Sequence, residues 1–216
     1  MQHSQDTSEQ KSLRLVETAV AVLLGGEGGL KIVALQKALF FADLIALRDF
    51  GETLTRNTYV ALQQGPVIAK CQKRLVRELA DRGLADQVLD GMARPLRLTR
   101  AGREYERRVL SDREWQVAKK LGSLFAGETS AFASSFSHDN PGWIAAYEQG
   151  VRATGVPLPI DMLLALQAEA RAPTADLRPA ASRPPAPSTR PPSPRSASRP
   201  RRSCRSAPAA CARRRA

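Results

Sequence analysis

The stretch IVALQKALFFADLIALR, residues 32–48, decides the fold, because apolar side chains surround almost its whole helical circumference. At about 100° per residue, the polar Gln36 and Asp43 project into the same arc as Phe40 and Leu44. A helix that is apolar on nearly all sides is buried on most of them. We therefore expect this segment to be the central helix of a domain, and Asp49-Phe50-Gly51 to end it.

The flanking sequence predicts a helix before this segment and a strand and a helix after it. The first helix is expected from about Lys11 to Leu24, with residues 1–10 disordered before it. Thr58 to Leu62 is a β-branched and aromatic run that predicts a short strand, bounded by Gly65-Pro66 as a turn. A third helix is expected from Val67 to about Arg82. Its predicted core-facing residues are Ile68, Cys71, Leu75 and Leu79.

Turn and capping signals divide the remaining sequence into short elements. Segments 84–89 and 95–98 flank Asp90-Gly91, which predicts a small hairpin. Thr99 is expected to cap a helix that continues to Val109, and Ser111 with Glu114 forms a capping box for the next helix.

The last helical signals lie near the end of the folded part. Asn140 followed by Pro141 is typical of a helix start, and a final helix is expected after Leu158-Pro159, to about Ala170. The patterns together predict an α+β fold: a predominantly helical single domain, residues 11–171, around a central buried helix, with a small antiparallel β element.

Charge divides the chain sharply after residue 170. Residues 1–170 carry a net charge of +1, whereas residues 171–216 carry +11 and consist almost wholly of Ala, Arg, Pro and Ser. Such a composition buries too little apolar surface to offset the entropy of ordering, so 172–216 is predicted to be a disordered basic tail. Three interpretations stay open: an arm that binds nucleic acid or an acidic partner, an inert tether, or an out-of-frame product of GC-rich codons.

Several classes of protein are excluded by composition. No apolar run approaches the roughly 20 residues that a membrane-spanning helix needs, and the first residues carry no secretory signal. Three cysteines, two of them in the tail, supply neither a disulfide framework nor a metal site. We expect a cytoplasmic protein without metal or cofactor, and a structural role for the thiol of Cys71.

Residues for catalysis are scarce. The chain has two histidines, and only His138 lies in the predicted folded part. Although Ser137, His138 and Asp139 are consecutive, a catalytic triad needs side chains that converge from different elements. We therefore expect Ser137 to Asn140 to form a helix-capping turn and the protein not to be an enzyme.

The third predicted helix carries a cationic face opposite its apolar stripe. Lys70, Lys73, Arg74 and Arg77 fall within about 100° of arc, so this face is our candidate for binding an acidic partner or phosphates. A solvated amphipathic face is the alternative. The order of this helix, the hairpin and Leu98-Thr99 also fits a winged-helix transcriptional regulator, whose basic helix would enter the major groove of DNA. The near-zero net charge of the body argues against DNA binding.

Four segments resemble one known family, the SocA-like antitoxins of bacteria and phages that share the Panacea domain. The segments are LQKALFFADL (Leu35–Leu44), TYVALQQGPV (Thr58–Val67), LTRAGREY (Leu98–Tyr105) and SHDNPGW (Ser137–Trp143), and the resemblance covers roughly residues 12–150. It implies a non-catalytic protein that binds and neutralises a cognate toxin encoded beside it. The founding type of the family is a proteolytic adaptor that passes its toxin to the ClpXP protease, whereas other members neutralise by direct binding.

Overall fold

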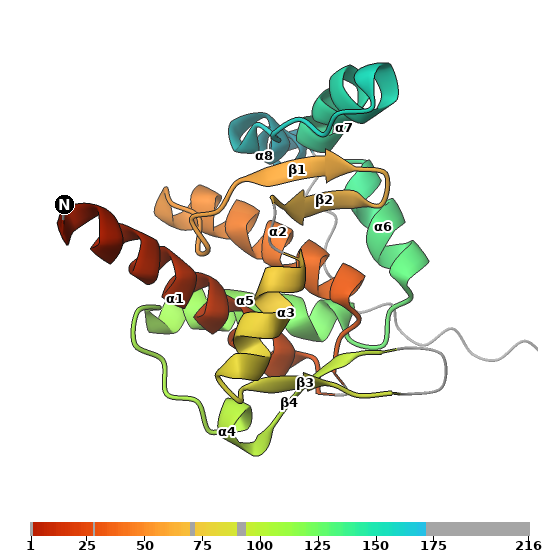
Figure 1. Cartoon of the computed structure of the whole chain (residues 1–216). Coiled ribbons are helices and arrows are strands. Elements are labelled where there is room, and N and C mark those ends of the chain that lie inside the picture. The colour runs from red at the N-terminus through yellow and green to blue at the C-terminus, as the bar shows by residue number, and fades with distance from the viewer. Residues whose placement is uncertain (1, 28, 70–71, 90–93, 172–216) are drawn as a thin grey trace, which may run out of the picture. The chain divides into compact units, whose positions relative to one another are not determined.

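The computed structural model describes residues 2–27, 29–69, 72–89 and 94–171, which belong to one compact unit, Met1–Ala175 (Figure 1). The predicted tail lies outside the described residues. The elements, in chain order, are α1 (Gln2–Gly25), α2 (Ile32–Phe50), β1 (Tyr59–Leu62), β2 (Gly65–Ile68), α3 (Gln72–Asp81), β3 (Ala85–Gln87), β4 (Leu96–Leu98), α4 (Arg100–Arg103), α5 (Asp112–Phe125), α6 (Ser130–His138), α7 (Pro141–Tyr147), the π-helical turn η1 (Glu148–Arg152) and α8 (Met162–Arg171).

Helix α2 lies at the centre of this unit. Helices α1, α5, α6 and α8 and strand β2 all pack against it. The side chains of Leu39, Phe40 and Leu44 are completely buried, and each such burial is worth about 2 kcal/mol. The predicted α+β class, with a buried central helix and small antiparallel β pairs, is confirmed.

Two glycines allow α1 and α5 to cross closely. A Cβ atom at Gly122 would lie 1.8 Å from the carbonyl oxygen of Val22, and one at Gly25 would lie 1.8 Å from that of Lys119. The hydroxyl of Ser123 then donates a hydrogen bond of 3.1 Å to the carbonyl of Gly25. Any larger residue at either glycine would force the two helix backbones apart.

The β element consists of two antiparallel hairpins, of which the sequence predicted one. Strands β3 and β4 pair as expected, with Ala85 opposite Leu98. Strands β1 and β2 form a second hairpin in which Ala61 lies opposite Pro66, so our assignment of Gly65-Pro66 to a turn before a helix was wrong. The backbone N–H of Ile68 points to α2, where it meets Gln36. Alternate residues of a strand face the same way, so position 66 has the same orientation as Ile68. An N–H at position 66 would point away from β1, and proline there therefore removes no hydrogen bond between the two strands.

Helix α3 consequently begins at Gln72, five residues later than predicted. Leu75 and Leu79 face the core as expected, whereas Ile68 is buried as part of β2. Cys71 lies outside the described residues. Near the N-terminus, α1 begins at Gln2 rather than near Lys11, since no glycine or proline interrupts the polar residues there.

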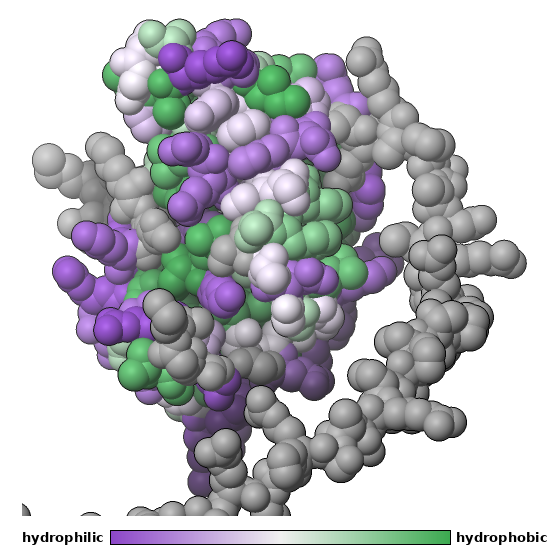
Figure 2. Space-filling model, turned by 90° about the vertical axis from the view of Figure 1, so that its right-hand side faces the viewer, coloured by the Kyte–Doolittle hydropathy of each residue, from purple (hydrophilic) through white to green (hydrophobic). Residues whose placement is uncertain are grey.

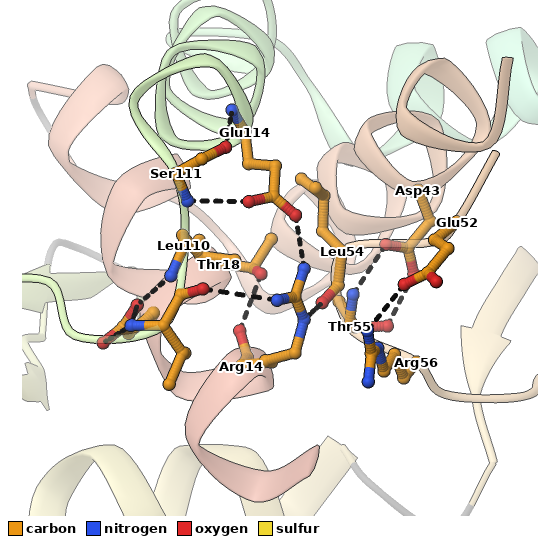
Figure 3. Close-up of polar contacts among 12 residues, drawn as sticks. Arg14, Thr18, Asp43, Glu52, Leu54, Thr55, Arg56, Leu110, Ser111 and Glu114 are labelled. Carbon is orange, nitrogen blue, oxygen red and sulfur yellow. Dashed lines mark hydrogen bonds and ion pairs between the residues drawn. The ribbon is translucent and has the colours of Figure 1, made fainter. Parts of the chain in front are cut away.

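The segment after α4 also departs from the prediction, which extended this helix to Val109. The carboxylate of Glu17, buried on α1, accepts hydrogen bonds from the backbone N–H groups of residues 108–110 and from the hydroxyl of Tyr105. Those N–H groups are then unavailable for helical pairing. Beside them, Arg14 donates to the carbonyl oxygens of Leu54 and Val109 and forms an ion pair with Glu114 (Figure 3).

Three predicted helix caps are confirmed. Ser111 and Glu114 form both hydrogen bonds of the capping box that starts α5, and the side chain of Asn140 caps α7 with Pro141 in its first turn. Thr99 caps α4. Helix α6, capped by Thr129, is an element that the sequence analysis did not assign. Among the helices of residues 2–171, none has the length and apolar character needed to cross a membrane.

Candidate functional site

The predicted cationic face forms on α3 as far as the structure describes it. Lys73, Arg74 and Arg77 are exposed, and none of them forms an ion pair or side-chain hydrogen bond with a described residue. The neighbouring Glu78 is engaged elsewhere, with the hydroxyl of Ser12 and with Arg82. Lys70, the fourth predicted member, lies outside the described residues. Three positive charges are therefore presented to solvent without a compensating partner in the part of the chain that is described.

Helix α3 is not the second helix of a helix-turn-helix. A winged-helix protein joins its recognition helix to a preceding helix by a short turn. Here the β1–β2 hairpin separates α2 from α3. The predicted hairpin β3–β4 does follow α3, but the arrangement required for major-groove reading is absent from the described residues.

The consecutive Ser137, His138 and Asp139 do not assemble a triad. The imidazole of His138 stacks on Trp143, with ring centroids 4.2 Å apart, and its Nε2 atom is buried. Asp139 is exposed at the end of α6. Burial and the charge of Lys37 lower the pKa of His138, against the opposite influence of Asp139. The predicted capping turn is correct only for Asn140, because Ser137 and His138 belong to the last turn of α6.

Three of the four recognised segments converge on the β1–β2 hairpin. From α2, Gln36 accepts the N–H of Ile68 at 3.1 Å, and Lys37 donates to the carbonyl of Pro66 at 2.9 Å. From α7, the indole of Trp143 donates to the carbonyl of Leu62 at 3.1 Å. The hairpin is thus attached to a helix on each side, which Figure 1 shows as β1 and β2 lying between α2 and α7.

Lys37 is a buried lysine. Its side chain is 1% exposed, and burial without a facing carboxylate lowers its pKa from 10.5 to about 7. Close to its ammonium group lies Gly65, whose φ of +98° favours glycine. A Cβ atom at Gly65 would lie 2.3 Å from Oγ of Ser137 and 2.7 Å from Nζ of Lys37. The glycine of the GPV segment is therefore required both by its backbone conformation and by its neighbours.

Asp43, in the same α2 segment, organises a separate buried cluster. Its carboxylate accepts hydrogen bonds from the backbone N–H and the hydroxyl of Thr55 (Figure 3). It also accepts one from the hydroxyl of Tyr59. Burial raises its pKa to about 6, although each of these donors acts in the opposite direction. Asp43 fixes the loop between α2 and β1, which is a structural role.

A family model described as antitoxin SocA-like, Panacea domain matches residues 35–144, just over half of the chain. The chain belongs to this family. The matched range begins in α2 and ends in α7, so the Panacea domain match includes the β1–β2 hairpin, its attachments on both sides and α3. No curated protein matches the chain, and no solved structure matches it.

An aromatic surface on this Panacea domain was missed by the sequence analysis. Phe132 and Phe136 lie one turn apart on α6, are about half exposed, and stack on each other with centroids 6.2 Å apart. Phe136 also contacts Phe41 of α2 and Phe125 of α5. Figure 2 shows that apolar side chains gather in the middle of the side of the molecule on which α6 lies. We name these four residues the aromatic patch. The i, i+4 spacing of Phe132 and Phe136 was the available signal, but it indicates a shared helix face only once α6 is assigned.

Proposed function

We propose that this chain is an antitoxin that binds a protein toxin encoded beside it and neutralises it by direct contact, in the cytoplasm and without catalysis. The family assignment supports the antitoxin role. Direct binding is supported by the exposed cationic face of Lys73, Arg74 and Arg77, whose charges have no partner among the described residues. A toxin surface with acidic side chains would supply the missing charges.

Electrostatic complementarity of this kind speeds the encounter of two proteins and selects the partner. The face is held rigidly, because Leu75 and Leu79 anchor α3 in the core directly behind it. Exposed aromatic residues are typical of protein interfaces, so the aromatic patch is a second contact region that the same toxin would fit. Neither surface demands a cofactor.

The proposal is tested by growth rescue with the full chain and the product of the adjacent reading frame. The wild-type chain should restore growth, and Arg74→Glu with Arg77→Glu should weaken toxin binding more than tenfold in calorimetry. The matched control reverses two exposed lysines of α5, Lys119→Glu with Lys120→Glu, and should bind as wild type does. Failure of the wild-type chain to rescue growth from a toxic neighbour refutes neutralisation. Equal binding by both double variants refutes the α3 face as the contact.

A host without ClpXP separates the two routes of neutralisation. Rescue that persists in this host, with the toxin level unchanged, supports neutralisation by contact. Rescue that disappears, while the toxin accumulates, replaces it with the adaptor route. The double variant Phe132→Ser with Phe136→Ser is measured in the same rescue assay. Loss of rescue assigns the aromatic patch to the toxin contact, and unchanged rescue excludes it.

A further inference from the structure

A cavity of about 370 Å³ lies beside the β1–β2 hairpin and is separate from both proposed contact surfaces. Its innermost lining residues, Gln36 and Lys37, are each 1% exposed, whereas Gln63 and Gln64 at the hairpin turn are exposed and form the rim. The walls between floor and rim are half-buried apolar side chains. They include Val33, Leu62, Val67 and Val151.

The floor of the cavity holds hydrogen-bond donors that are not fully used. Oε1 of Gln36 accepts the N–H of Ile68, but Nε2 of the same amide is buried and has no partner among the described residues. An ammonium group carries three donors, and for Nζ of Lys37 the hydrogen bond to Pro66 accounts for one. Buried polar groups in folded proteins are nearly always paired. Two consecutive residues that line the cavity and carry unused donors therefore indicate an acceptor that binds there.

The charges around the floor define the kind of acceptor. None of the residues described as lining the cavity is acidic, and the titratable neighbour of Lys37 is His138, which adds no negative charge. A bound anion would therefore be the first counter-charge for the Lys37 ammonium. One cation, one amide donor and apolar walls match a carboxylate on an apolar stem.

We propose that this cavity binds a carboxylate group, which accepts hydrogen bonds from Nζ of Lys37 and Nε2 of Gln36 while its apolar stem lies against Val33, Leu62 and Val151. The carboxylate belongs either to a free organic acid or to a C-terminus or acidic side chain of a bound protein. The site does not depend on the proposed toxin contact, since it lies on neither the α3 face nor the aromatic patch.

The experiment measures binding of hexanoate and of hexanamide, its neutral counterpart, to the full chain by calorimetry in carboxylate-free buffer. A short apolar peptide with a free C-terminus, and the same peptide amidated, form the second pair of probes. We expect saturable binding of at least one acid, at least tenfold tighter than its amide. The tighter of the two acids then identifies the source: hexanoate indicates a free organic acid, and the peptide indicates a protein chain.

Two variants localise the site. Gln36→Glu keeps an acceptor for the N–H of Ile68 but replaces the donor with a negative charge, and it should weaken acid binding at least tenfold. Gln116→Glu makes the same exchange on the exposed side of α5 and should leave binding unchanged. Val151→Trp fills the cavity without altering either donor and should also abolish binding, with folding of each variant checked by its thermal melt. Equal affinity for acid and amide, absence of binding by both acids, or an acid affinity that neither Gln36→Glu nor Val151→Trp lowers overturns the proposal.

Discussion

Replacing Lys37 by methionine should stabilise the folded protein near neutral pH and destabilise it near pH 10. Burial lowers the pKa of Lys37 from 10.5 to about 7, a shift that corresponds to about 5 kcal/mol at about 1.4 kcal/mol per pKa unit. Between these two pH values the unfolded chain holds a proton that the folded chain has released. The free energy of unfolding of the wild type therefore rises with pH across this window, by up to about 5 kcal/mol, and the cost of the buried charge is complete below pH 7.

Methionine removes this cost but also the hydrogen bond to the carbonyl of Pro66, which is worth about 1–3 kcal/mol when a buried acceptor is left unpaired. Lys37→Met should thus be more stable than the wild type by roughly 2–3 kcal/mol near pH 6.5, and less stable by roughly 1–2 kcal/mol near pH 10. His138 faces the ammonium group, but its lowered pKa places its own titration below this window.

Urea denaturation at half-unit pH intervals from 6.5 to 10, in buffers without carboxylates, measures the effect. Lys119→Met serves as the control because Lys119 is exposed on α5, and its difference from the wild type should not depend on pH. Parallel profiles for the wild type and Lys37→Met would refute the reasoning, since they would mean that the lysine keeps its proton equally well in both states. A saturating carboxylate, if bound at this floor, should flatten the wild-type profile.

Three further changes test other parts of the structure. Burial raises the pKa of Asp43 to about 6, so this carboxyl ionises in the unfolded chain before it does in the folded one, and the wild type should lose up to about 3 kcal/mol of stability between pH 4 and pH 6. Asp43→Asn should abolish this loss, which denaturant titrations across the range measure. Gly65→Ala should cost more than about 2 kcal/mol, whereas Gly51→Ala, also at positive φ but with open space around it, should cost only about 1 kcal/mol; equal losses in melting experiments would contradict the crowding at the hairpin. Ser111→Ala should remove the capping box and cost about 1 kcal/mol, seen as a lower melting temperature with α5 otherwise intact.

The parts of the fold that the sequence predicted are those in which neighbouring residues supply the whole signal. The capping box of Ser111 and Glu114 involves residues three positions apart, and the paired ends of β3 and β4, Gln87 and Leu96, are nine positions apart in the chain. The burial of α2 was likewise predictable, because a helix that is apolar on nearly all sides is buried in a protein folded in water.

Several departures from the prediction arise from partners that the local sequence pattern does not reveal. Glu17 captures the N–H groups of residues 108–110 from about 90 residues away, and this long-range bonding ends α4 early. Pro66 is a helix or turn signal by itself, yet as an edge residue of β2 its missing N–H costs nothing. Gln36 and Lys37 interrupt an otherwise apolar helix, but only the folded hairpin shows what they bind.

The structure explains why the segments that identify the family are weak guides to its partner. Gln36, Lys37 and Trp143 each make one hydrogen bond that joins the β1–β2 hairpin to α2 or α7, and Gly65 leaves the space that the Lys37 ammonium occupies. Substitutions at these positions disturb buried contacts. The cations of α3 are exposed, so their replacement alters charge at little cost in stability. If α3 is the contact as proposed, the partner can change through α3 while the recognisable segments stay fixed. Under the proposed function, partner specificity should therefore be sought in the surfaces between the recognised segments rather than in the segments themselves.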